Sequence, residues 1–160
     1  MRKGKIHRFK TKVLYRDLDM YSVAYHPKYF EFADTARNQA FEDYGYPVQD
    51  QLKDKVGFTV AGMENVSFKR PLFMGEEITV FTEASDFTSK TCKVTHWINL
   101  GNDDSVISDE NKFSKAVFKA TYTLVFVSIE EIADYPLNAE NIKKMRVMEF
   151  GERVKLALGL

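Results

Sequence analysis

The first part of the chain alternates between apolar and polar positions with a period of two. Over residues 9–15 the two faces differ, and Lys10 and Lys12 occupy the polar one. This period is typical of a half-buried strand. The predicted buried face carries Phe9, Thr11, Val13 and Tyr15.

The next stretch changes to intervals of three and four, which predicts a helix that buries one side. Its buried stripe is Tyr29, Phe30, Ala33, Ala36, Ala40, Phe41 and Tyr44. Pro27 places the helix start at or just after His26, because proline lacks an N–H and suits a first helical position. Gly45 with Pro47 predicts its end.

The rest of the chain is rich in Val, Ile, Thr and aromatic residues, which favours strands. The predicted strands are residues 58–68, 77–87, 91–100 and 113–127, with turns at 70–75 and 88–90 and a longer, polar and mobile loop at 101–111. No crossover helix separates them, so we predict an α+β fold in which an antiparallel sheet packs on one helix. Smaller predicted elements are a helical turn at 48–55, a last helix at 139–150 capped by Asn138, and an apolar end segment at 154–160.

Composition limits the classes of protein that this chain can belong to. With 160 residues, 44% of them hydrophobic, and no repeat or linker, it suits one domain spanning 1–160. Lys plus Arg and Asp plus Glu are 23 each, which argues against a nucleic-acid or anionic-membrane binder. The single cysteine, Cys92, forms no internal disulfide and alternates as an ordinary strand residue. No apolar run reaches membrane-spanning length, and we expect a cytoplasmic protein.

Two carboxylates, Asp17 and Asp19, lie on the segment between the first strand and the long helix. The first N–H groups of a helix are unpaired and carry partial positive charge, so they can receive an anion or a polarised carbonyl oxygen. One small volume could therefore hold a carboxylate and an oxyanion site. An aspartate before a helix is, however, more often a cap than a catalyst, and the residues alone leave both roles open.

A longer set of motifs resembles the 4-hydroxybenzoyl-CoA thioesterase-like acyl-CoA thioesterases, including the branch associated with the Tol–Pal system. The motifs are Tyr15-x-Asp17-x-Asp19, Val23-x-Tyr25-His26-x-x-Tyr29, Asp34-x-x-Arg37, Phe58-x-Val60, Val66-x-Phe68-x-Arg70-Pro71-Leu72-x-x-Gly75-Glu76 and Ala120-x-Tyr122-x-Leu124-Val125-x-Val127. The likeness covers about residues 8–137. It implies the hotdog fold, a curled antiparallel sheet wrapped around one long central helix.

The resemblance also implies a site. Asp19 corresponds to the catalytic carboxylate, acting as nucleophile or general base, and His26 to the helix start whose main-chain N–H polarises the thioester carbonyl. The resemblance also implies the His26 side chain as an additional active-site group. It implies acyl-CoA as substrate, a homodimer or homotetramer with the site between subunits, and no metal or cofactor. The expected substrate-binding residues are Asp17, Tyr25, Tyr29, Lys69, Arg70 and Lys90, the three cations being a candidate set for the phosphates of coenzyme A.

The chain departs from the family pattern at three places. Tyr21 and Ser22 replace loop glycines, so any positive φ there carries a cost; Asp34 replaces a glutamate, and Pro27-Lys28 replaces small residues. Asp19 and His26 remain, so these changes bear on substrate range rather than on reaction class.

Structural roles are predicted for other polar residues. His96 alternates with apolar neighbours on a strand and is expected in the core or an interface. His7, near the chain end, is expected in solvent. Asp34 and Arg37, three apart on the helix, are expected to form a local ion pair.

Two other functions remain open at this point. A hotdog hydratase or dehydratase would aim an Asp–His pair at the acyl α and β carbons, and the spacing from Asp19 to His26 permits this. A non-catalytic acyl-CoA-binding module would be favoured by a fused DNA-binding segment, of which the sequence shows no sign.

Overall fold

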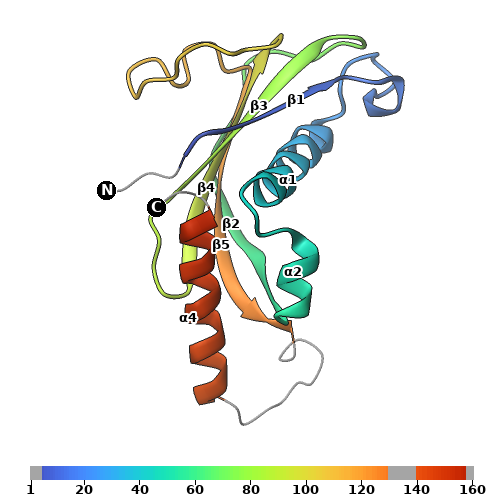
Figure 1. Ribbon diagram of the computed structural model, residues 1–160. Helices are drawn as coiled ribbons and strands as arrows, with labels where there is room; N and C mark the ends of the chain where they lie inside the picture. The colour runs from blue at the N-terminus through green and yellow to red at the C-terminus, as the bar shows by residue number, and fades with distance from the viewer. Residues whose placement is uncertain (1–4, 130–139, 158–160) are drawn as a thin grey trace.

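The computed structural model describes residues 5–129 and 140–157, which form one antiparallel sheet with helices packed against it (Figure 1). The strands are β1 (His7–Lys12), β2 (Val56–Phe68), β3 (Glu77–Ser85), β4 (Thr91–Leu100) and β5 (Phe118–Ser128). The helices are α1 (His26–Asp43), α2 (Val48–Lys53) and α4 (Glu140–Ala157), with one 3₁₀ turn at Tyr15–Asp17. The strand order is β1-β3-β4-β5-β2 and every pair is antiparallel. The predicted hotdog fold is confirmed.

Helix α1 begins and ends where the sequence predicts. Its second residue is Pro27, and its last turn closes with the Tyr46 N–H on the Phe41 carbonyl (2.9 Å) and the Gly45 N–H on the Glu42 carbonyl (3.1 Å). This Schellman arrangement needs a residue with positive φ, and Gly45 has φ +83°. The helix therefore runs for 18 residues and then turns sharply into α2.

The main core lies between α1 and the inward face of the sheet. Ala33, Ala36 and Ala40 are almost fully buried, and these small side chains let the helix lie close to the strands. Large residues of β4 and β5 fill the space around them: Val94, Ile98, Phe118, Tyr122 and Leu124. Cys92 belongs to this core, and burial raises the pKa of its thiol to about 12, so it is a packing residue.

The loop after β4 lies on the opposite face of the sheet. It covers a second cluster in which Phe81 and Trp97 stack at 5.0 Å and Phe113 meets the Trp97 ring edge-on. The cation of Lys112, buried over Trp97, forms an ion pair with Glu83. This packing corrects one expectation, because residues 113–117 are part of the loop rather than of β5.

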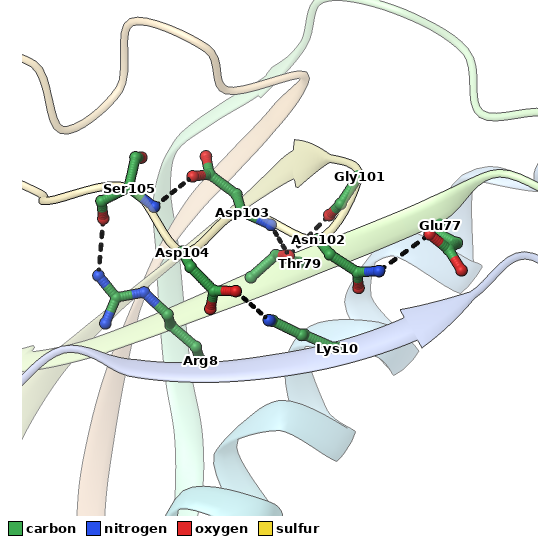
Figure 2. Close-up of polar contacts among 9 residues, drawn as sticks. All are labelled: Arg8, Lys10, Glu77, Thr79, Gly101, Asn102, Asp103, Asp104 and Ser105. Carbon is green, nitrogen blue, oxygen red and sulfur yellow. Dashed lines mark hydrogen bonds and ion pairs between the residues drawn. The ribbon is translucent and has the colours of Figure 1, made fainter.

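Polar contacts fasten the first part of this loop to β1 and β3 (Figure 2). The hydroxyl of Thr79 donates to the Gly101 carbonyl (2.7 Å) and accepts from the Asp103 N–H (2.9 Å). Lys10 pairs with Asp104 at 2.7 Å, and Arg8 donates to the Ser105 carbonyl at 3.0 Å. Hydrogen bonds from Ser105 and Asn99 lower the pKa of Asp103 to about 2. The loop therefore covers the part of this face that lies over β1 and β3.

Helix α4 packs beside the sheet through Val147, Phe150 and Val154. A side chain at Gly151 would put its Cβ 3.2 Å from the Phe126 ring, so glycine allows the close approach. The helix is longer than predicted, since it continues past Phe150 to Ala157. The predicted cap Asn138 and residues 139 and 158–160 lie outside the described residues.

Other differences concern the chain before α1 and the ends of shorter elements. Strand β1 stops at Lys12, and Tyr15 in the 3₁₀ turn is 82% exposed, so its prediction as a buried strand residue is wrong. His7 is buried, bonds Asp43 at 2.7 Å and meets the Tyr44 ring, so its prediction as a solvated residue is also wrong. Strand β3 ends two residues earlier than predicted and α2 is shorter. In the described part of the chain, no helix is long and apolar enough to cross a membrane.

His96 lies in the core, as expected, and its ring bonds the Thr82 hydroxyl at 3.0 Å and meets the Tyr122 ring edge-on. Burial, and secondly the charge of Arg37, hold its pKa well below the usual 6.5. Just below pH 6.5 the folded protein therefore keeps this ring neutral, whereas the unfolded chain binds a proton there.

We expect the free energy of unfolding to fall as pH drops below about 6.5, because there the unfolded state binds a proton at His96 that the folded state excludes. Urea titrations at fixed protein concentration, from about pH 7.5 to about pH 5.5, measure this slope. His96→Gln should flatten it. An unchanged slope in that variant would assign the acid sensitivity to other groups.

Candidate active site

The segment from Asp17 to Tyr25 forms a tight hairpin directly before α1. Its two sides meet at a bridge between Leu18 and Ala24, and its tip is closed by the Asp19 N–H on the Val23 carbonyl (2.9 Å) and the Ser22 N–H on the Asp19 carbonyl (3.1 Å). Ser22 has φ +62°, a conformation that favours glycine. A positive φ therefore occurs at this replaced glycine, where it carries a conformational cost.

Asp19 holds the tip of the hairpin with one carboxylate oxygen. Its Oδ1 accepts the Tyr21 N–H at 2.7 Å, an Asx turn that fixes the side chain. In the described part of the chain no hydrogen bond reaches Oδ2, and the residue is only partly buried. Asp19 therefore combines a fixed orientation with one oxygen available for a ligand.

Asp17 has a different environment. It is 5% exposed, its Oδ2 accepts the Leu14 N–H at 2.8 Å, and its carbonyl accepts the Tyr25 N–H at 2.9 Å. These bonds close the 3₁₀ turn and align the hairpin with the helix start. Both the side chain and the main chain of Asp17 thus hold the loop together.

The start of α1 presents one free peptide donor. Pro27 has no N–H, and the Lys28 N–H bonds the Tyr25 carbonyl at 2.8 Å. The His26 N–H has no acceptor among the described residues. It lies at the positive end of an 18-residue helix, where a negatively charged or polarised oxygen is stabilised. The His26 imidazole and the Tyr25 side chain are both exposed.

Tyr29 ties the helix start to the turn that follows β2. Its hydroxyl accepts the Leu72 N–H at 3.0 Å, and the Ala24 N–H bonds the Leu72 carbonyl at 2.8 Å. Burial raises the pKa of Tyr29, so the hydroxyl stays neutral. Tyr29 is 3% exposed, which fits a positioning role better than a direct contact with a ligand.

The three candidate cations are not equivalent. The Arg70 guanidinium donates to both carboxylate oxygens of Glu76 (3.2 and 2.7 Å), and Glu76 also accepts the Phe73 N–H. Arg70 therefore stabilises the turn in which it lies. The side chain of Lys69 is exposed and forms no ion pair within the described residues. Lys69, unlike Arg70, is therefore open to an anionic ligand.

Lys90 lies away from the hairpin. Its carbonyl accepts the Phe126 N–H, and Phe126 pairs with Phe58 near the start of β2. The helix start instead contacts Phe68, at the other end of β2. Within a single chain, Lys90 therefore does not lie close to Asp19.

Two residues near the helix start were not singled out from the sequence as site residues. The Phe68 ring meets the His26 ring edge-on at 5.2 Å, and Glu76 fixes Arg70. Phe68 was detectable as the last apolar residue before the Arg70-Pro71 turn, but only the fold reveals its contact with the helix.

Two hollows lie elsewhere, between α2 and α4, with volumes of about 290 and 520 Å³. Both are lined by Tyr46, Asp54 and Arg153, and neither includes Asp19 or His26. The hairpin and helix start are thus a surface site on a single chain. Within the described residues, no group of three His, Cys, Asp or Glu could hold a metal ion.

Comparisons with known proteins point to one family. The family described as the thioesterase-like superfamily matches residues 13–153. YneP of Bacillus subtilis (strain 168), named as a candidate acyl-CoA thioesterase, is 29% identical over 98 residues, 61% of this chain and 70% of that protein. A solved candidate thioesterase from Bartonella henselae is 22% identical with a TM-score of 0.67, covering 79% of this chain and 94% of that one. A DHNA-CoA thioesterase from Staphylococcus aureus is 16% identical with a TM-score of 0.66, covering 94% and 95%.

Asp17→Ala should destabilise the fold by about 1 kcal/mol, because it removes the acceptor that closes the 3₁₀ turn. Urea unfolding at fixed protein concentration measures the change. Asp50→Ala is a matched control, since Asp50 lies on the short helix α2 and its carboxylate, within the described residues, pairs only with exposed Lys53. Equal stability of Asp17→Ala and the control would contradict the positioning role.

Proposed function

Because the chain belongs to the thioesterase-like superfamily, we propose that it hydrolyses acyl-CoA thioesters to a free acid and coenzyme A. The observation that carries the proposal is the pairing, on one hairpin and helix start, of a fixed carboxylate with an unpaired peptide donor. The names of YneP and of the Staphylococcus aureus structure, both referring to coenzyme A thioesters, support this substrate class. On the motif from Tyr15 to Tyr29 we further assign the chain to the branch associated with the Tol–Pal system.

In the proposed reaction the thioester carbonyl oxygen accepts the His26 N–H. Charge that develops on this oxygen is stabilised by the donor and by the helix dipole, an effect worth about 3 kcal/mol where one such donor has been removed. Oδ2 of Asp19 then attacks the carbonyl carbon or takes a proton from an attacking water, while Oδ1 remains bonded to Tyr21. The coenzyme A thiolate leaves and takes up a proton. In the nucleophilic route, water then hydrolyses the mixed anhydride on Asp19, which releases the free acid and regenerates the carboxylate.

A second copy of the chain completes the proposed site. Strand β2 forms one edge of the sheet over 13 residues, and no described strand pairs with its outer side. The exposed apolar residues along this edge include Val60, Met63 and Val66. The opposite edge, β1, is short and carries Arg8, Lys10 and Lys12, which discourage pairing. Pairing through β2 would cover this surface and could bring Lys90 of one subunit toward the site of the other, beside Lys69.

We expect Asp19→Asn to lower kcat at least about a hundredfold, because the amide preserves volume but supplies neither a nucleophile nor a base. Steady-state release of thiol from a panel of acyl-CoA esters measures the change. His26→Ala is the informative control, because it removes the imidazole and keeps the peptide donor, so turnover should persist. If the kcat of Asp19→Asn stays within a few-fold of the wild-type value, a residue other than Asp19 must supply the nucleophile or base. Wild-type protein that binds the esters without releasing thiol would favour the binding-module or hydratase alternatives.

Assembly gives a second test. Light scattering at micromolar concentration should show at least a dimer, and specific activity should fall on dilution below its dissociation constant. Val60→Lys, placed on the exposed β2 face, should weaken the dimer and the activity together. A monomer with full activity would contradict the proposal that two subunits form the site together.

A further inference from the structure

The Phe68 ring is the hub of an aromatic cluster under the start of α1. Ring centroids lie 5.2 Å from Phe68 to His26, 5.2 Å to Tyr29, 5.2 Å to Phe118 and 6.0 Å to Phe30. The contact with His26 places Phe68 directly beside the residue whose N–H is free.

Behind Phe68 the space between helix and sheet is filled. Tyr29 and Phe118 are almost fully buried, and the Tyr29 hydroxyl is held by the Leu72 N–H. Phe30 packs edge-on against Phe118 at 5.5 Å. A group bound at the His26 N–H therefore cannot extend inward at this point unless Phe68 moves.

Phe68 itself is 41% exposed, more than Tyr29, Phe30 and Phe118. Its backbone is also fixed relative to the catalytic hairpin, because the turn that follows it bonds Ala24 through Leu72 and bridges Val23 through Phe73. An exposed ring face on a rigid support is suited to contact an apolar or aromatic group and to limit its size.

We propose that Phe68 is a specificity-determining residue that forms the wall of the acyl-group subsite. The inference rests on the proposed thioester hydrolysis: with the carbonyl at the His26 N–H, the acyl group lies against the Phe68 ring and its length is limited by that ring. A smaller residue opens space between Tyr29, Phe30 and Phe118, and a larger one closes it.

The test measures kcat/KM for saturated acyl-CoA esters from acetyl to palmitoyl, and for benzoyl-CoA, with the wild type, Phe68→Ala and Phe68→Trp. Phe68→Ala should favour longer chains, raising their kcat/KM about tenfold relative to the wild type's best substrate, and Phe68→Trp should favour shorter ones. Phe58→Ala is the control on the same strand, since Phe58 stacks on Phe41 ten residues from Phe68. It should leave the chain-length preference unchanged.

Circular dichroism and the oligomeric state check each variant, and Phe68→Leu replaces Phe68→Ala if the latter does not fold. If the Phe68 variants keep the wild-type chain-length preference, or if their kcat/KM changes by the same factor with every ester, the proposal is overturned. Either result leaves thioester hydrolysis in place. A wild type that cleaves none of the esters overturns both.

Discussion

The geometry of the candidate site depends on the peptide groups of one buried residue, Leu72. Its N–H bonds the Tyr29 hydroxyl at 3.0 Å and its carbonyl accepts the Ala24 N–H at 2.8 Å. These two bonds join the long helix, the hairpin before it and the turn after β2. The Asp19 carboxylate and the His26 N–H are thereby held on one rigid support, as preorganised catalysis requires.

The remaining packing determines which surfaces are open. The loop after β4 covers part of one face of the sheet with the Phe81–Trp97 cluster. Helix α1 packs on the other face, and α4 joins the same core through Val147, Phe150 and Val154. The long edge of β2 and the hairpin surface stay exposed, and they adjoin at Phe68, which contacts His26. The chain is a member of the thioesterase-like superfamily. Its candidate active site, Asp19 and the His26 N–H, thus lies next to the sheet edge where we propose that a second subunit binds.

The sequence predicts the elements whose ends are set by local backbone chemistry. Pro27 and Gly45 determine the start and end of α1, and strand-favouring composition between the turn at 88–90 and the loop at 101–111 predicts the bounds of β4. It does not predict positions that depend on distant partners. His7 is buried because Asp43, 36 residues away, lies beside it. Residues 113–117 have a strand-like composition but pack over Trp97 as a loop.

The same limit applies to the site. Asp19 and His26 follow from a contiguous motif, and the structure places them on one hairpin and helix start. The sequence does not predict that Glu76 pairs with Arg70, because the two side chains meet only when the intervening turn folds back. Lys90 lies at the other end of β2 from the helix start, a separation that a linear motif cannot reveal.

A crystal structure of the protein with an acyl-CoA analogue, in which a methylene replaces the thioester sulfur, tests the central claim most directly. The account predicts a carbonyl oxygen about 2.7–3.1 Å from the His26 nitrogen. It also predicts that Asp19 Oδ2 lies about 3–3.5 Å from the carbonyl carbon, or is joined to it through one water. A carbonyl bound to another donor, with Asp19 out of reach, would contradict it.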